Sequence, residues 1–149
     1  MAFDAFLKLD GIKGESQVKG FEGQIQIESF QWGVAQTVTT IGGGGSGAGR
    51  PSRSDFLFTA ASSSASPLLF INSVTGTHIK EGVLTLRSAG GSQTNFSTIK
   101  LTDILISAYQ QAGDEDGSAP VDSAALNYTK IEYAYNGVVQ DFDFATLKA

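Results

Sequence analysis

A glycine-rich run is the first stretch whose spacing could support chemistry. Residues 42–49 read Gly-Gly-Gly-Gly-Ser-Gly-Ala-Gly and contain the G-x-G-x-x-G pattern of dinucleotide-binding loops. Such a loop must lead into a helix whose N-terminus holds the phosphates, whereas Arg50-Pro51-Ser52-Arg53 here precedes a predicted strand. The run also misses the G-x-S-x-G nucleophile elbow, because Ala48 stands where the last glycine is required. We therefore predict a flexible loop and no cofactor.

Side chains that could act as a nucleophile or general base are scarce. Cysteine is absent and His78 is the sole histidine, which also removes the usual zinc ligand sets. Ser97 and Lys100 match an S-x-x-K pattern, but residues three apart on a strand point to opposite faces. His78 follows a predicted helix end, where it would serve the last carbonyls or lie on the surface. We expect no catalytic residues and predict that the protein is not an enzyme.

One acidic cluster remains as a candidate metal site. Asp114, Glu115 and Asp116 precede Gly117, and Asp122 follows in a stretch rich in Gly, Ser and Pro. Calcium prefers such oxygen ligands, yet the EF-hand order with its distal glutamate is missing. We interpret Asp114–Asp122 as a solvated loop and expect no metal.

One short helix must be positioned by a chain that otherwise consists of strands. The signals are Ser66 as N-cap, Pro67 at the first helical position and Gly76 as the left-handed C-cap. The helix is expected at about Pro67–Thr75. Pro67, Phe70, Ile71 and Val74 fall on one stripe, which we predict to face the barrel.

Most other segments show the alternation of half-buried strands. In the second predicted strand, the apolar residues stand at odd positions up to Ile27 and at even positions from Phe30 onward. Because one regular strand would put these two sets on opposite faces, a β-bulge is expected near Glu28-Ser29. Gly82 is expected at a bulge or a close backbone approach. Asn136-Gly137 is the strongest hairpin signal. The pattern predicts a mainly β protein: an antiparallel β-barrel or sandwich of one domain, residues 1–149, with the short helix packed on its side or end.

Composition limits the partners. The 149-residue chain carries a formal charge of −5, which argues against nucleic acid and anionic membrane surfaces. No apolar run is long enough for a membrane helix, and the beginning lacks the pattern of a secretory signal. We expect the chain to be made and folded in a cytoplasm.

Two features indicate self-association. Ile104-Leu105-Ile106 is apolar on both faces, so the helix or a neighbouring subunit must cover the second face. A glycine run can lie closely along another backbone. Because no other chain is implied, the simplest partner is a second copy, and repeated contacts close into rings or continue as filaments.

Segments along nearly the whole chain resemble the haemolysin co-regulated protein (Hcp) family of type VI secretion systems. The run Gly42–Gly49 is similar to the glycine-rich extended loop of some members. The other matching segments, in order, are Phe6–Ser16, Glu28–Gly33, Ser66–Leu69, Gly76–Lys80, Leu84–Arg87, Ala89–Gly91, Ile99–Ser107 and Leu126–Ile131. The loop from Gly113 to Asp122 does not align.

The resemblance implies a homohexameric ring, with rings stacked into a hollow tube inside a contractile sheath and below a spike protein. It implies small effectors carried in the lumen, and export without a signal peptide, from the cytoplasm to the outside of the cell. Gln31 points away from Phe30 and Trp32, so we expect it at the lumen or a subunit contact. The residues expected at ring-to-ring or subunit contacts are Gly42, Gly43, Gly44, Gly45, Ser46, Gly47, Ala48, Gly49, Arg50 and Arg53.

Two alternatives stay open. Phage tail-tube proteins have a similar architecture. A ligand-binding β-barrel, for example a carbohydrate module, would use exposed aromatic side chains. Its candidates are Trp32, Tyr109, Tyr133 and Tyr135, which read more simply as core or interface residues.

Overall fold

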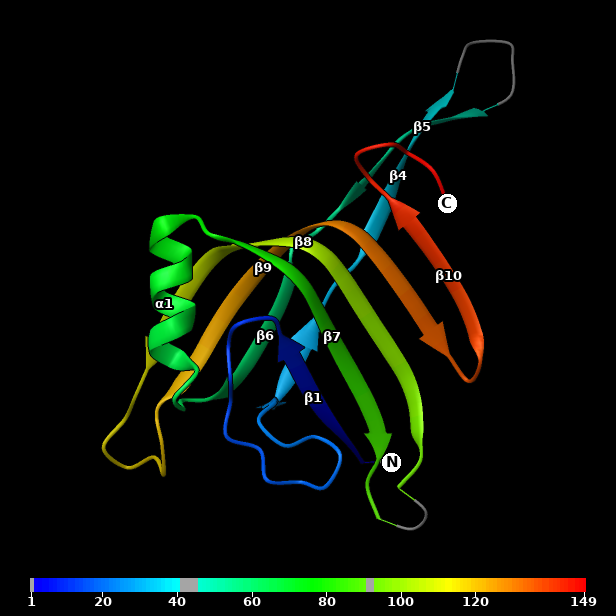
Figure 1. Cartoon of the computed structure of the whole chain (residues 1–149). Helices are drawn as coiled ribbons and strands as arrows, with labels where there is room; N and C mark the ends of the chain where they lie inside the picture. The colour runs from blue at the N-terminus through cyan, green and yellow to red at the C-terminus, as the bar shows by residue number, and fades with distance from the viewer. Residues whose placement is uncertain (1, 41–45, 91–92) are drawn as a thin grey trace.

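A computed structural model describes residues 2–40, 46–90 and 93–149. One antiparallel sheet curls into a nearly closed barrel, with strand order β2-β1-β7-β8-β9-β6-β3 and β10 added beside β9 (Figure 1). A two-stranded ribbon, β4 with β5, stands away from the barrel. The bounds are β1 Phe3–Leu9, β2 Ile25–Ile27, β3 Ser29–Gln31, β4 Val34–Thr40, β5 Ser46–Arg53, β6 Phe56–Ala61, α1 Ser66–Thr75, β7 His78–Ser88, β8 Asn95–Ala112, β9 Val121–Tyr135 and β10 Val138–Asp143. The predicted fold class is confirmed.

The sheet closes where the chain passes from β2 to β3. Strand β2 pairs with β1, whereas β3 pairs with β6. Between them, the backbone N–H of Glu28 donates to the carbonyl of Thr59. The bulge expected at Glu28-Ser29 is therefore wrong: the change of parity occurs because the chain exchanges one partner strand for another.

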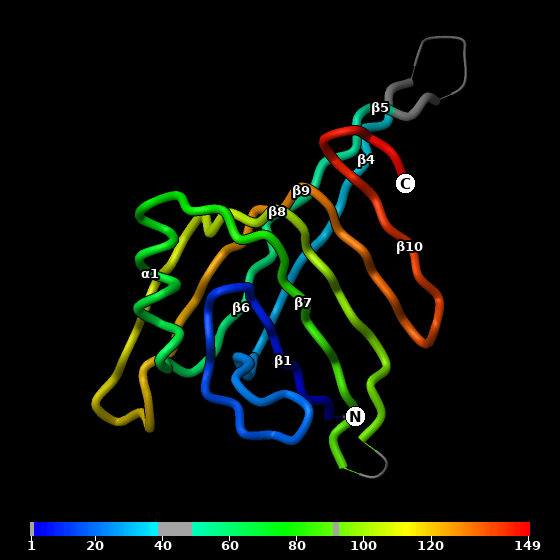
Figure 2. The backbone as a smooth tube through the Cα atoms, viewed as in Figure 1, coloured from blue at the N-terminus to red at the C-terminus, as the bar shows by residue number. Residues whose placement is uncertain are grey.

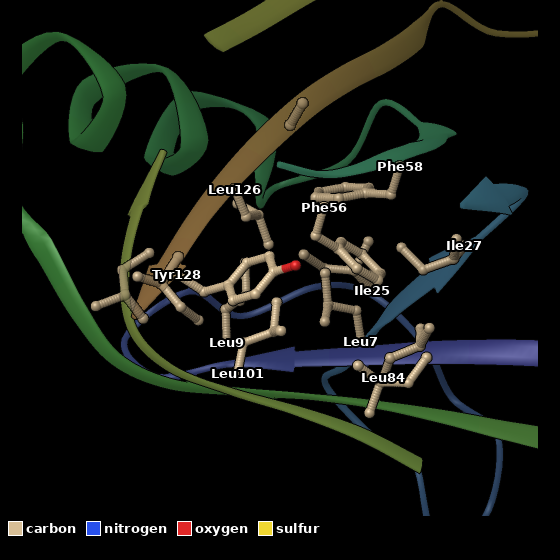
Figure 3. Packing of buried hydrophobic residues seen from close by; sticks show 14 of the residues in the cluster. Leu7, Leu9, Ile25, Ile27, Phe56, Phe58, Leu84, Leu101, Leu126 and Tyr128 are labelled. Atoms are coloured by element: carbon tan, nitrogen blue, oxygen red, sulfur yellow. The ribbon is translucent and has the colours of Figure 1, made fainter. Parts of the chain in front are cut away.

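The barrel interior is filled by apolar side chains from every wall (Figure 3). Tyr128 is completely buried and lies between Leu126 and Leu9. Gly82 on β7 leaves room for side chains of the two flanking strands: an added Cβ would lie 2.7 Å from Leu9 Cδ2 on β1 and 2.9 Å from Ile104 Cδ1 on β8. The expected close approach at Gly82 is confirmed, and a side chain there would overpack the core.

Strand β1 is covered on both faces. Ala5, Leu7 and Leu9 point into the barrel. Phe6, on the other face, stacks on Phe21 with ring centroids 4.3 Å apart. The segment between β1 and β2 thus forms an outer cover for this wall.

Helix α1 has the expected bounds but not the expected orientation. Gly76 adopts φ +66° and its N–H donates to the carbonyl of Ser73, as a left-handed C-cap should. Ala65 precedes the first turn without a side-chain cap, so the N-cap role predicted for Ser66 is wrong. The buried residues of the helix are Ser66 and Leu69, and Leu69 joins the apolar core together with Ala65.

The stripe predicted to face the barrel lies on the outside. Phe70 is 52% exposed, Ile71 45% and Val74 68%. The i, i+3, i+4 spacing correctly placed these residues on one face, but that face is turned away from the strands. Helix α1 packs against β8 instead through its narrower Leu69 face.

The stretch predicted as a flexible loop is largely a β-ribbon. Ser46, Gly47, Ala48, Gly49, Arg50 and Arg53 belong to β5, in register with β4 from Val34↔Arg53 to Thr40↔Ser46. Gly42, Gly43, Gly44 and Gly45 lie outside the described residues. Local glycine content suggested a loop, whereas pairing with the β-branched residues of β4 determines a strand.

The hairpin predicted at Asn136-Gly137 is confirmed. Asn136 and Gly137 both have positive φ, 48° and 86°, as a type I′ turn requires. The turn joins β9 to β10, with Tyr135 opposite Val138.

Candidate assembly surfaces

His78 is a surface residue paired across strands. Its Nδ1 lies 2.8 Å from Asp103 Oδ1, and the two side chains are 66% and 53% exposed. Asp103 also accepts a hydrogen bond from the Thr129 hydroxyl. These hydrogen bonds, first that of His78 and then that of Thr129, lower the pKa of Asp103. The pair therefore lies open to solvent on the outer surface.

Asp122 does not belong to a solvated acidic loop. It is 2% exposed, so that part of the interpretation of Asp114–Asp122 is wrong. Its carboxylate accepts hydrogen bonds from the hydroxyls of Ser62, Ser66 and Tyr109. Burial first, and then the bond to Asp122, raises the pKa of Tyr109. The Asp122 carboxylate thus anchors the beginning of α1 through Ser66. Among the described residues, no group of three side chains of the metal-ligating kinds occurs.

The β4–β5 ribbon is the most prominent projection of the molecule (Figure 2). At Gly49 an added Cβ would lie 2.8 Å from the carbonyl oxygen of Thr37, so the two strands approach closely. Arg50 is exposed on the ribbon and is free to contact another subunit.

Arg53 holds the base of this ribbon to the barrel. Its Nε donates to the carbonyl of Tyr128 over 2.5 Å. The guanidinium lies 4.7 Å from the ring centre of Phe144 and 5.7 Å from that of Tyr128. This half-buried position makes Arg53 an internal anchor in the monomer.

Gln31 lies exposed in a hollow on the outer face of β3, β6, β8 and β9. The hollow has a volume of about 450 Å³, and all of its lining residues are uncharged. Ser29 and Thr59 share a hydrogen bond of 2.6 Å there, and Leu57 is 44% exposed. Gln31 therefore belongs to an uncharged, concave part of the surface.

An apolar groove runs between the ribbon and β9–β10. We call it the ribbon groove, and its volume is about 550 Å³. Trp32 and Tyr133 meet there edge to face at 5.4 Å. Sequence reasoning missed this site, although Trp32 and Tyr133 were both named among the aromatic candidates for ligand binding. The residues that define it are Trp32, Val34, Pro51, Tyr133, Asp141 and Phe142.

The four aromatic residues considered for sugar binding do not form one site. Trp32 and Tyr133 lie in the ribbon groove, whereas Tyr135 packs against Phe96. Tyr109 is bonded to buried Asp122. The expectation that they are core or interface residues fits this arrangement.

A barrel with a projecting ribbon and exposed apolar side chains on its outer surfaces is the architecture of a protein built for assembly. The family model described as "Type VI secretion system effector, Hcp" matches residues 6–135. The chain belongs to the Hcp family, and its expected role as a type VI tube subunit is confirmed.

Individual relatives agree with this assignment. Protein hcp1 of Pseudomonas aeruginosa is 31% identical over 136 residues, which cover 91% of this chain and 84% of that protein. A solved structure of a type six secretion system protein has a TM-score of 0.92 at 25% identity, covering 99% of both chains. Hcp1 of Salmonella typhimurium has a TM-score of 0.86 at 27% identity, again covering 99% of both. Within the described residues, no helix has the length and apolar character needed to cross a membrane.

Proposed function

We propose that six copies of this chain form a ring and that rings stack into the inner tube of a type VI secretion system. The observation that carries the proposal is the family match across residues 6–135 together with the projecting β4–β5 ribbon. A ribbon held at its base by Arg53 can reach an adjacent copy without disturbing the barrel core.

The barrel is suited to repetition. Its interior is sealed by a continuous apolar core, so forming a ring requires no refolding of the subunit. Apolar side chains remain exposed at the ribbon, α1 and β10, where Val38 is 64%, Val74 68% and Val138 68% exposed. Surfaces of this kind usually contact another protein.

The further parts of the proposal concern cargo, partners and export. Gln31 and the neutral hollow around it would face the lumen and contact small effectors. Sheath and spike proteins would surround and cap the tube. The chain would be cytoplasmic before assembly and would leave the cell through the secretion system, without catalysing a reaction.

The direct experiment is light scattering and negative-stain imaging of the purified chain. We expect particles of about six times 15.6 kDa and rings with six-fold symmetry. A particle of 15.6 kDa at micromolar concentration, with no rings in the images, would overturn the proposal.

A further inference from the structure

The outer face of α1 lacks a partner within the described monomer. Leu68, Phe70, Ile71 and Val74 are between 37% and 68% exposed, on a helix of only ten residues. The helix contains no charged residue. A stripe this apolar is expected to be buried. We call it the α1 stripe.

The ribbon groove lies on the other flank of the molecule. Figure 1 shows α1 on one side of the barrel, and β10 with the ribbon on the opposite side. Val34 is 59% exposed and Tyr133 is 42% exposed. Among the residues that the structure describes, Asp141 is the only charged one that lines the groove. Both surfaces are thus apolar, nearly uncharged and open.

We infer that the α1 stripe of one copy docks into the ribbon groove of the next copy. The inference rests on the proposed ring and identifies its lateral contact. An apolar helix face in an apolar groove is a common mode of recognition. Because the two surfaces differ and lie on opposite flanks, the contact is heterologous, and repeating it closes a ring when the rotation allows.

Charge complementarity supports a second copy as the occupant. Lys80 lies just beyond the C-terminal end of α1, is exposed and forms no ion pair within the described part of the chain. Asp141 at the groove has only an exposed partner, Lys130, 3.5 Å away. An exposed ion pair of this kind contributes little to folding stability, so Asp141 remains available to pair with a cation of a neighbouring copy. Docking the stripe would therefore bring a free cation toward the single acid of the groove.

The first test places a charge in each surface. Ile71→Asp and Val34→Asp should each raise the concentration at which rings dissociate by at least about tenfold, because a buried unpaired carboxylate is costly. Gln26→Asp is the control, since Gln26 is exposed on β2 and lies in neither the α1 stripe nor the ribbon groove. It should leave the rings unchanged. Far-ultraviolet circular dichroism checks that each variant folds.

The second test exchanges the two charges. Lys80→Glu and Asp141→Lys should each weaken rings, and the double variant should restore them at low salt. Failure of the double variant to exceed either single variant would contradict the inference. This comparison does not depend on inserting a charge into an apolar surface.

The outcomes separate this inference from the proposed function. Wild-type rings that persist in Ile71→Asp and Val34→Asp overturn the docking and leave the tube proposal standing. If Val34→Asp loses the rings but Ile71→Asp keeps them, a segment other than the α1 stripe occupies the groove. That result also overturns the inference. A wild-type chain that stays monomeric overturns both.

Discussion

At the scale of single residues, Asp122 is the side chain whose role departs most from its sequence context. It follows an acidic run but lies buried at the point where β9 begins beside α1. Three hydroxyls donate to its carboxylate. A buried carboxylate is tolerated only when it is bonded in this way. We interpret it as the anchor that keeps the helix on the barrel.

We predict that Asp122→Ala lowers the free energy of unfolding by about 2–3 kcal/mol, because buried hydroxyls lose their acceptor. Urea denaturation monitored by fluorescence measures the loss. Ser62→Ala removes only one of the donors and should cost about 1 kcal/mol. Equal effects of the two substitutions would contradict the central role of Asp122.

Asp103 gives a prediction about pH. Its pKa is lowered from the usual 3.8 by the hydrogen bonds from His78 and Thr129. A carboxyl with a lowered pKa in the folded state stabilises the fold above its unfolded pKa, and this stabilisation disappears as the pH falls through the folded pKa. We expect His78→Ala to raise the pKa of Asp103 and to remove that part of the acid-side pH dependence.

A carbon-13 NMR titration of the Asp103 carboxyl measures this shift directly. Thr129→Val serves as the comparison and should raise the pKa less, since His78 is the larger cause. An unchanged Asp103 pKa in His78→Ala would show that the cross-strand pair does not form in solution.

At the scale of elements, the β4–β5 ribbon and α1 divide the proposed contacts between two directions. The ribbon projects away from the barrel, whereas α1 lies along its flank (Figure 1). The ribbon is anchored at Arg53, and those of its residues whose burial the structure describes contribute no buried side chain to the core. Changes to its far end should therefore affect assembly and not folding.

We predict that deletion of Gly42–Gly49 leaves hexameric rings but impairs stacking into tubes and secretion. Electron microscopy of concentrated rings and a secretion assay would measure these effects. Tubes and secretion unaffected by the deletion would show that the ribbon tip has no stacking role.

At the scale of the whole molecule, the hollow on the wall of β3, β6, β8 and β9 is lined by uncharged residues, while the flanks expose apolar side chains. Gln31, Ser29 and Thr59 line this part of the wall. In a ring, a wall of this kind is suited to the lumen, because it neither adheres strongly to cargo nor repels it by charge. The apolar flanks are suited to lateral contacts.

We predict that Gln31→Arg keeps the six-fold ring and reduces the amount of an effector that co-purifies with wild-type rings, because six added cations would line the lumen. Quantitative gel analysis of purified rings measures the ratio of effector to subunit. Gln26→Arg, at an exposed position of β2, is the control. An unaltered ratio together with unaltered assembly would remove Gln31 from both lumen and subunit contacts.

Much of the fold follows from local patterns. Alternation predicted the long strands, Asn136-Gly137 predicted the hairpin, and Gly76 marked the end of α1. The two turn signals depend on backbone conformations that few residues adopt, and alternation depends on the two-residue repeat of a strand, so neighbouring residues suffice for both. The β5 strand was missed because glycine, serine and proline carry no strand signal, and its formation depends on pairing with β4.

The sequence by itself determined which residues share a face, and the tertiary structure decided what each face meets. The stripe of Phe70, Ile71 and Val74 is real, yet it is exposed, whereas isolated Leu69 reaches the core. Periodicity reports a common face but cannot distinguish an interior from a surface kept for another copy. That choice depends on the curvature of the barrel and the space at its flank, which residues distant in the chain build together.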